Sequence, residues 1–313
     1  MAEATILKIG ARGSPLSLAQ TGLVAEALTR ANPGLVTEII AIKTTGDKMR
    51  NISLAAIGGK GLFVKEIEEA LLAGEIDLAV HSAKDLPSEL PPGLAIGAVP
   101  ARADFRDVII TKAPGGLAAL PIKARVGTSG LRRQAQLLAA RPDLVIEPIR
   151  GNVATRLRKL KAEFDATILA AAGLDRLGLN PAGAEPLATE IMLPSAGQGT
   201  LALEIRSGDL RVQELVGPIG HRDTALALAA ERGFLHRLGS GCQLPVAALA
   251  QFKDRTMVMD GLIASLDGKR VIRDQKTVEL DSPEAAANFG KLLATELLAA
   301  GGEEIMKGID SQI

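Results

Sequence analysis

Between about residue 5 and residue 200, short runs of β-branched residues alternate with longer segments whose apolar residues recur at helical spacing. This alternation is typical of α/β domains with a largely parallel sheet, because a crossover between parallel strands needs a helix. Ser14 and Pro15 have the residue types of a helix N-cap and a first helical position. A second helix, from about residue 62, is predicted to stop near Gly74. The predicted strands are 5–9, 37–42, 76–80, 94–99, 107–111, 124–126, 144–149 and 166–170.

Two segments interrupt this rhythm. The polar stretch 100–107 and the Gly-rich stretch 194–199 are predicted to be crossovers between two α/β lobes. We therefore expect a first lobe in residues 1–100, completed by 200–218, and a second lobe in residues 101–199. Two connections predict a hinged pair of doubly wound lobes with a cleft between them.

The pattern changes after about residue 219. An Ala-rich helix over 221–238 precedes the loop 239–245, and three strand-like runs follow at 246–252, 256–265 and 270–280. The turn 266–269 predicts a hairpin between the last two strands. Ser282 and Pro283 open a final helix that is predicted to end at Gly301. Residues 219–313 are therefore expected to form a smaller α+β domain.

The composition excludes several classes of protein. The 36 basic residues balance the 36 acidic ones, and neither Trp nor Tyr occurs. A global polycation and an aromatic platform for nucleic-acid bases are therefore not expected. A single cysteine excludes an internal disulfide, and no signal peptide or transmembrane segment is recognisable. These features predict a soluble, cytoplasmic, multi-domain protein that binds neither nucleic acid nor membrane.

Basic residues concentrate in one region. Residues 124–161 contain nine basic and two acidic residues, a net charge of +7. Arg132, Arg133 and Arg150 lie where a strand gives way to a helix, and Arg12 does so in the first lobe. Helix N-termini at the carboxyl ends of parallel strands bind anions, and guanidinium groups suit carboxylate or phosphate. A solvated basic helix face is the alternative; it suits the cations at 158, 159 and 161 better than these turn arginines.

Three further sites carry reactive residue types. Lys60 lies in a Gly-rich loop that lacks P-loop spacing, so an ordinary loop is the alternative to an anion site. Lys84 and Asp85 follow a predicted strand, where a carboxylate beside a cation can stabilise positive charge or pass a proton; a surface turn is the alternative. A lone cysteine is usually buried and inert, but the loop around Cys242 has almost no apolar neighbours, so an exposed thiol that carries a covalent group is the alternative. No histidine or cysteine spacing suggests a metal site.

Together these segments resemble the porphobilinogen deaminase (hydroxymethylbilane synthase) family. The matching stretches, in the family's order, are RGSPL at 12–16, GGKGLFVK at 58–65, AVHSAKD at 79–85, VGTSGLRR at 126–133, IRGNV at 149–153, RLG at 176–178, AGQG at 196–199 and GCQLP at 241–245. They span nearly the whole chain and are specific as a set.

The resemblance implies two lobes like those of periplasmic binding proteins, plus the smaller α+β domain. It also implies a monomeric transferase of tetrapyrrole biosynthesis. Such an enzyme removes ammonia from porphobilinogen and joins four units head to tail into hydroxymethylbilane. The implied cofactor is dipyrromethane, attached by a thioether to Cys242.

The resemblance also implies roles for individual residues. Asp85 would be the catalytic acid, with Lys84 beside it. The cofactor would be held by Lys84, Thr128, Ser129, Arg132, Arg133 and Cys242. The substrate would be bound by Arg12, Ser14, Gln20, Lys60, Phe63, Arg150, Arg156 and Arg176.

Two positions of the second lobe depart from the family's pattern, and Ala247 and Ala248 also stand where polar or glycine residues are common. Gly130 stands where many members have a second serine, and Phe105 replaces a proline that is common in the crossover. Two other functions remain open from the residues alone. A non-catalytic protein that closes on a carboxylate ligand would use the arginines but not Cys242 or Asp85. A cysteine-dependent transferase or hydrolase would use Cys242 but not the arginines.

Overall fold

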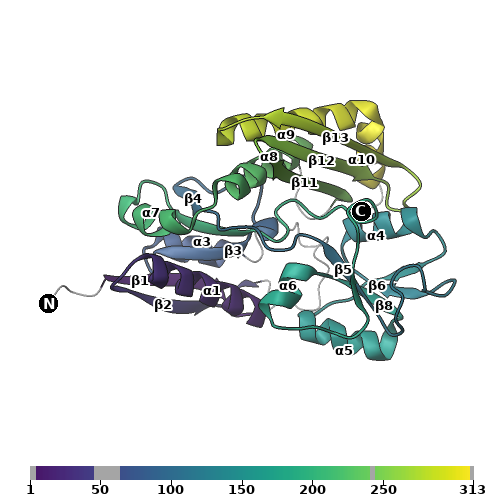
Figure 1. The fold of residues 1–313 in the computed structure, drawn as a ribbon, viewed down its shortest axis with the longest axis horizontal. Coiled ribbons are helices and arrows are strands. Elements are labelled where there is room, and N and C mark those ends of the chain that lie inside the picture. The colour runs from purple at the N-terminus through teal and green to yellow at the C-terminus, as the bar shows by residue number, and fades with distance from the viewer. Residues whose placement is uncertain (1–4, 46–63, 240–243, 311–313) are drawn as a thin grey trace. The chain divides into compact units, whose positions relative to one another are not determined.

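The computed structural model describes residues 5–45, 64–239 and 244–310, which fall into two compact units. The first unit comprises residues 1–102 and 200–225, and the second comprises 103–199 and 226–313. Figure 1 labels their helices and strands.

The first unit contains a five-stranded sheet with the order β2-β1-β3-β10-β4. Its strands are β1 (Thr5–Arg12), β2 (Leu35–Ile42), β3 (Leu78–Ser82), β4 (Leu94–Ala98) and β10 (Leu201–Arg206). Strands β1, β2 and β3 are parallel, whereas β10 is antiparallel to both of its neighbours. The chain reaches β10 from the second unit, so the crossover at residues 194–199 completes this sheet.

Helices cover both faces of this sheet. Helices α1 (Pro15–Ala31) and α7 (Leu210–Val216) pack on one face through Leu28 and Val212, among other apolar residues. Helix α3 (Lys65–Leu72) packs on the other face through Ile67 and Leu71. The predicted N-cap of α1 is confirmed, because the Ser14 hydroxyl accepts a hydrogen bond from Ser17 N at 3.2 Å.

The second unit begins with a sheet of the same design, in the order β7-β6-β8-β5-β9. Its strands are β5 (Asp107–Thr111), β6 (Arg125–Gly127), β7 (Val145–Glu147), β8 (Ala166–Ala170) and β9 (Ala184–Pro186). Strands β6, β7 and β8 are parallel, and β5, the first strand after the other crossover, is antiparallel to β8. Helix α4 (Leu131–Ala140) packs on one face, and α5 (Val153–Glu163) and α6 (Ala171–Arg176) pack on the other.

The C-terminal part of the chain forms an antiparallel sheet, β11-β12-β13, with helices on one face. Its strands are β11 (Val246–Lys253), β12 (Thr256–Ala264) and β13 (Val271–Glu279), and its helices are α8 (Arg222–Leu238), α9 (Pro283–Leu297) and α10 (Glu303–Asp310). Helices α8 and α9 cross at Gly233 and Gly290, where an added Cβ would meet the other helix's backbone. These glycines allow the two backbones to approach closely.

The C-terminal sheet packs on the lobe that precedes it within the second unit. Leu249 and Leu262 join Ala135 of α4 in one apolar cluster. The β12–β13 hairpin also contacts α4, because Gln134 Nε2 donates a hydrogen bond to Leu266 O at 3.3 Å. The second unit is therefore held together by a shared core and by the docked hairpin.

The fold class predicted from the sequence is confirmed: two doubly wound α/β lobes and a smaller α+β domain. Strands 107–111 and 166–170 have the predicted bounds, and the others shift by one to three residues at one or both ends. The predicted helix break at Gly301 is confirmed, because this residue is non-helical and marks a kink between two helices, but the prediction that no helix follows it is wrong. Helix α9 ends at Leu297, a π-turn over Leu298–Gly302 follows, and α10 continues the chain. Gly301 lies within that turn at φ +110°.

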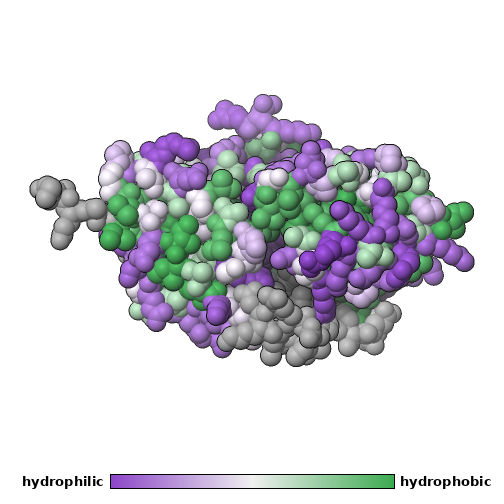
Figure 2. Space-filling view, turned by 90° about the horizontal axis from the view of Figure 1, so that it is seen from below, coloured by the Kyte–Doolittle hydropathy of each residue, from purple (hydrophilic) through white to green (hydrophobic). Residues whose placement is uncertain are grey.

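Across residues 5–45, 64–239 and 244–310, no helix combines the length and apolar character that crossing a membrane requires. Figure 2 shows hydrophobic and hydrophilic residues interspersed on the face that it views. Single exposed apolar side chains among polar ones are ordinary for a protein surface.

Gly268, at the tip of the docked hairpin, tests this packing. Its φ is +71°, and an added Cβ would lie 2.6 Å from Ala135 O and against Ala139 N of α4. Gly268→Ala is therefore expected to lower the free energy of unfolding of the second unit by about 2–5 kcal/mol. The control is Gly208→Ala, since Gly208 has a similar φ of +81° but no atom within 4 Å of the added Cβ. Chemical denaturation of both variants measures the difference, and equal losses would contradict the docking.

Candidate active site

Four of the predicted cofactor residues lie together at the start of α4. Strand β6 ends at Gly127, and Thr128 and Ser129 lead into the helix that begins at Leu131. Ser129 Oγ donates a hydrogen bond to Ile149 O at 2.7 Å, which ties this turn to the segment after β7. Arg132 and Arg133 occupy the first turn of the helix, so hydroxyl and guanidinium groups share one helix N-terminus.

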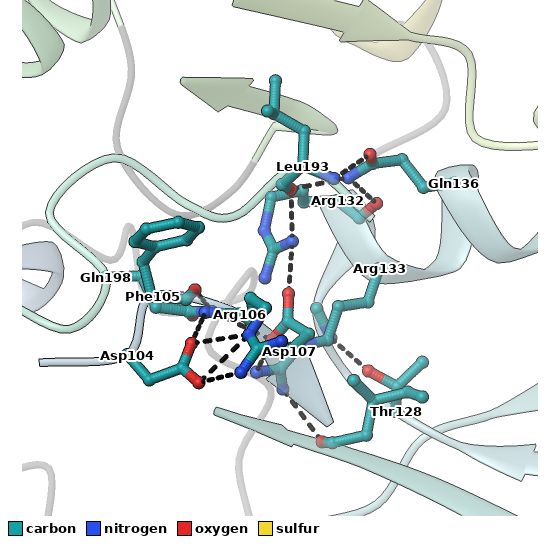
Figure 3. A network of polar contacts seen from close by, with 12 residues as sticks. Asp104, Phe105, Arg106, Asp107, Thr128, Arg132, Arg133, Gln136, Leu193 and Gln198 are labelled. Carbon is teal, nitrogen blue, oxygen red and sulfur yellow. Dashed lines mark hydrogen bonds and ion pairs between the residues drawn. The ribbon is translucent and has the colours of Figure 1, made fainter. Parts of the chain in front are cut away.

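A buried carboxylate holds both arginines. Asp107, the first residue of β5, is fully buried. Arg132 Nη1 lies 2.7 Å from Asp107 Oδ2, and Arg133 donates to Asp107 Oδ1 through Nη2 at 2.7 Å and Nε at 3.1 Å. Gln198 Nε2 also donates to Asp107 Oδ1 at 3.0 Å. Figure 3 shows the network around this carboxylate.

Backbone carbonyls complete the arrangement. Arg132 Nη1 donates to Leu193 O at 2.7 Å, and Arg133 Nη1 donates to Ile168 O at 3.1 Å. Asp107 supplies one negative charge to two positive ones, so these three side chains carry a net positive charge. A rigid, partly desolvated positive site of this kind is complementary to a carboxylate ligand.

Two more predicted substrate residues add to the positive charge of the second unit. Burial, together with the charge of Arg133, lowers the pKa of Arg156 to about 10. Burial also lowers the pKa of Arg176, whose Nη2 donates to Gly199 O at 2.7 Å. Both guanidinium groups are partly removed from water, and their charged forms are destabilised. An anionic ligand would relieve this electrostatic cost. Arg150 is partly buried and follows β7 by three residues.

In the first unit, the predicted catalytic residues lie on a short turn at the end of β3. Lys84 and Asp85 belong to a single 3-10 turn, Ala83–Asp85, and the Asp85 side chain is exposed. Ala83 N donates to Thr200 O at 3.0 Å, which fixes the start of this turn. An exposed carboxylate on an anchored turn is able to meet a bound molecule.

The predicted substrate residues of the first unit lie in two different environments. Arg12 ends β1 and is partly buried, close in sequence to Ser14 at the start of α1. Gln20 is buried, and its amide exchanges hydrogen bonds with Ser82 Oγ at 2.9 and 3.2 Å. This geometry suits Gln20 to holding the end of β3 better than to binding a carboxylate directly.

Lys60, Phe63 and Cys242 lie outside the described residues. The two departures in the second lobe are described: an added Cβ on Gly130 would meet only Arg133 Cδ, at 3.9 Å, and Phe105 packs beside the cluster that joins α4 to the C-terminal sheet. There is therefore room for the serine that Gly130 replaces.

Sequence reasoning did not single out Asp107 or Gln198. Asp107 lies at the end of the polar crossover, where an acidic residue is expected to be exposed at the surface. One signal was available: Asp107 begins an apolar strand whose five residues are all buried, so its carboxylate needed a cationic partner.

Asp107→Asn is expected to lower the free energy of unfolding of the second unit by about 3–5 kcal/mol, because two buried guanidinium groups lose their counter-charge. The control is Asp104→Asn in the same crossover. Asp104 pairs with Arg106 at 2.7 Å at a more exposed position, where such a pair contributes about 0–1 kcal/mol. Denaturation of both variants checks the prediction, and a loss below about 1 kcal/mol for Asp107→Asn would refute it.

Two family models together match most of the chain. The family model "Porphobilinogen deaminase, dipyromethane cofactor binding domain" matches residues 7–214, and "Porphobilinogen deaminase, C-terminal domain" matches residues 225–299. The chain is 50% identical over 307 residues to a porphobilinogen deaminase of Moorella thermoacetica, covering 98% of this chain and 97% of that protein. It is also 50% identical over 309 residues to one of Syntrophotalea carbinolica, covering 98% and 97%.

Among solved structures, the periplasmic VFT2 domain of Bordetella pertussis BvgS is similar at 15% identity and a TM-score of 0.40, over 70% of this chain and 88% of that one. The sequence matches are far stronger and cover both units. The chain belongs to the porphobilinogen deaminase family, as its motifs predicted, and is therefore an enzyme of hydroxymethylbilane synthesis.

Proposed function

We propose that the second unit binds the carboxylates of a pyrrole chain while the first unit supplies the reacting carboxylate, Asp85. The observation that supports this proposal is the rigid cationic cluster of Arg132 and Arg133 on Asp107. Each pyrrole unit carries an acetate and a propionate, so a growing chain accumulates negative charge. Guanidinium groups held in place before binding lose little freedom when they pair with such carboxylates.

The residues at the start of α4 fit a dipyrromethane cofactor. Guanidinium and hydroxyl donors suit its carboxylates, and the α4 N-terminus adds backbone N–H groups. We propose that Lys84, Thr128, Ser129, Arg132 and Arg133 hold it and that Cys242 bonds to it through a thioether. When bound, the cofactor supplies the pyrrole α-carbon to which new units are joined.

The remaining cations are proposed to bind the substrate's carboxylates. Arg156 and Arg176 are suited to this because burial already weakens their hydration. Arg12 ends β1, Arg150 follows β7 by three residues, and Ser14 caps the start of α1. Lys60 is proposed as a further cation, and Phe63 as the cover of the incoming ring. Gln20 is proposed to act through Ser82.

Asp85 is proposed to act on the reacting atoms. When porphobilinogen loses ammonia, its methylene carbon and ring become positively charged, and a nearby carboxylate stabilises that charge. The same carboxylate can accept the proton that leaves the ring carbon after the new bond forms. Lys84, on the same turn, is proposed to take part beside it. Water finally releases the product of four units.

We further propose that the enzyme works in the cytoplasm as a monomer and without nucleic acid. Balanced charge, a single cysteine and the absence of Trp and Tyr support this proposal.

Asp85→Asn is expected to keep the fold, because Asp85 is exposed, and to lower kcat by about 100- to 10,000-fold. Glu89→Gln is the control, since Glu89 is an exposed acid only four residues away. Steady-state kinetics and circular dichroism measure both effects. A near-normal kcat for Asp85→Asn would remove Asp85 from the chemistry.

The covalent attachment is tested by the intact mass of the purified protein. Wild type is expected to carry an adduct of two pyrrole units that gives a colour with Ehrlich's reagent, and Cys242→Ser to carry none. A fully active protein of unmodified mass would rule out the thioether.

Arg156→Met is expected to raise KM for porphobilinogen by about 10- to 100-fold, the worth of a charged hydrogen bond. In the Cys242→Ser background, the unfolding temperature of the Arg156→Met variant should equal or exceed that of the protein that keeps Arg156. The pKa of Arg156 is lowered, so its charge destabilises the folded state at neutral pH, and this penalty is relieved only as the pH rises above about 10. Arg158→Met is the control, because Arg158 is exposed on the same helix. Equal KM values for the two variants would exclude Arg156 from binding.

A further inference from the structure

Three ionisable side chains are buried together in the first unit, outside the residues considered so far. His81 on β3 is 5% exposed, Glu204 on β10 is 0% exposed and Glu68 on α3 is 7% exposed. His81 Nε2 lies 3.0 Å from Glu204 Oε2. The register of the two strands pairs His81 with Ala202, which places His81 and Glu204 on the same face of the sheet. We call these three residues the histidine–glutamate cluster.

Burying these three ionisable side chains costs more free energy than burying apolar side chains. Burial, together with Glu204, raises the pKa of Glu68, so Glu68 keeps its proton to a higher pH than an exposed glutamate. The other charged groups on this face have partners of their own: Glu69 is exposed and lies 3.8 Å from Lys65, and Arg206 donates to Leu71 O and Ile76 O. Apolar residues of similar volume often stabilise a core as well as a buried ion pair does. Stability alone is therefore a weak reason for the cluster.

The position of the cluster suggests a better reason. His81 and Ser82 are the last two residues of β3, directly before the turn that carries Lys84 and Asp85. Because side chains alternate along a strand, these two point to opposite faces of the sheet. His81 is held on the α3 face by Glu204, and Ser82 is held on the α1 face by Gln20. Both faces of the strand end are thus fixed by polar contacts.

We propose that His81 and Glu204 are positioning residues: their buried pair fixes the end of β3 and thereby aims Asp85 at the reacting carbon. This inference rests on the proposed role of Asp85. The turn must hold the carboxylate in one place while successive units are added. A displacement of about 1 Å at a reacting group lowers a rate by as much as about 100-fold, so a directional pair at the strand end has a large effect on turnover.

The test separates positioning from stability with two variants of the holoenzyme. Glu204→Gln keeps the shape and a hydrogen-bond acceptor but removes the charge. It is expected to carry the cofactor by intact mass, to lower kcat by about 10-fold and to leave KM within about 2-fold. The double variant His81→Leu, Glu204→Leu replaces the pair by apolar packing. It is expected to unfold at or above the temperature of Glu204→Gln, with a kcat lower than that of Glu204→Gln.

Glu69→Gln, on the same helix as Glu68 but exposed, is the matched control and should have the wild-type kcat. If the cluster is merely structural, kcat per folded molecule stays normal in Glu204→Gln, or returns with thermal stability in the double variant. Either result would overturn the inference. Asp85→Asn is measured in parallel: a near-normal rate there refutes the role of Asp85 itself, whereas an inactive Asp85→Asn beside a normal Glu204→Gln refutes only the positioning role.

Discussion

The buried carboxylate of Asp107 is the constraint on which the proposed binding site of the second unit depends. Two arginines on adjacent positions of a helix would repel each other and turn toward water without a counter-charge. Asp107 holds both at 2.7 Å in a setting where its own side chain is fully buried. In such a low-dielectric setting an ion pair is strong and a missing partner is costly. The guanidinium groups are therefore in place before any ligand arrives.

The same carboxylate connects the binding site to the chain's two crossovers. Asp107 ends the first crossover, and Gln198, which donates to it, lies in the second. Gln198 Nε2 also donates to Phe105 O at 2.9 Å. Within the second unit, the residues proposed to bind anions and the segments that lead to the first unit thus share one hydrogen-bond network.

Local patterns in the sequence predicted much of the fold but few of the contacts between residues that are distant in the sequence. The strands at 107–111 and 166–170 were predictable because apolar, β-branched runs with clear ends carry the signal. The grouping of Arg132 and Arg133 at a helix start was also predictable, since a strand and a helix flank them. The contact of Asp107 with α4 was not predictable, because it depends on the sheet order β6-β8-β5. His81 and Glu204 are 123 positions apart in the sequence, so no local pattern predicts their contact. Helix α10 was missed because Gly301 was taken as the end of the last helix, although a further helix begins directly after this kink.

On the proposed function, the two units contribute different groups to the reaction. The second unit provides cations that are partly removed from water. This desolvation destabilises their charged forms and lowers the pKa values of Arg156 and Arg176. The first unit provides an exposed acid on a turn whose strand is fixed on both faces. On the proposed function, this loss of stability in the second unit is offset when an anion binds, as is common at functional sites.

A double-mutant cycle between Asp107 and Arg133 tests this account most directly. Unfolding free energies are measured for the Cys242→Ser protein and for the same protein with Asp107→Asn, Arg133→Met or both. If the carboxylate holds the arginine in place without a ligand, the two changes are coupled by about 2 kcal/mol or more. Losses that add to within about 0.5 kcal/mol would show that the two groups are independent and would contradict a preformed cationic site.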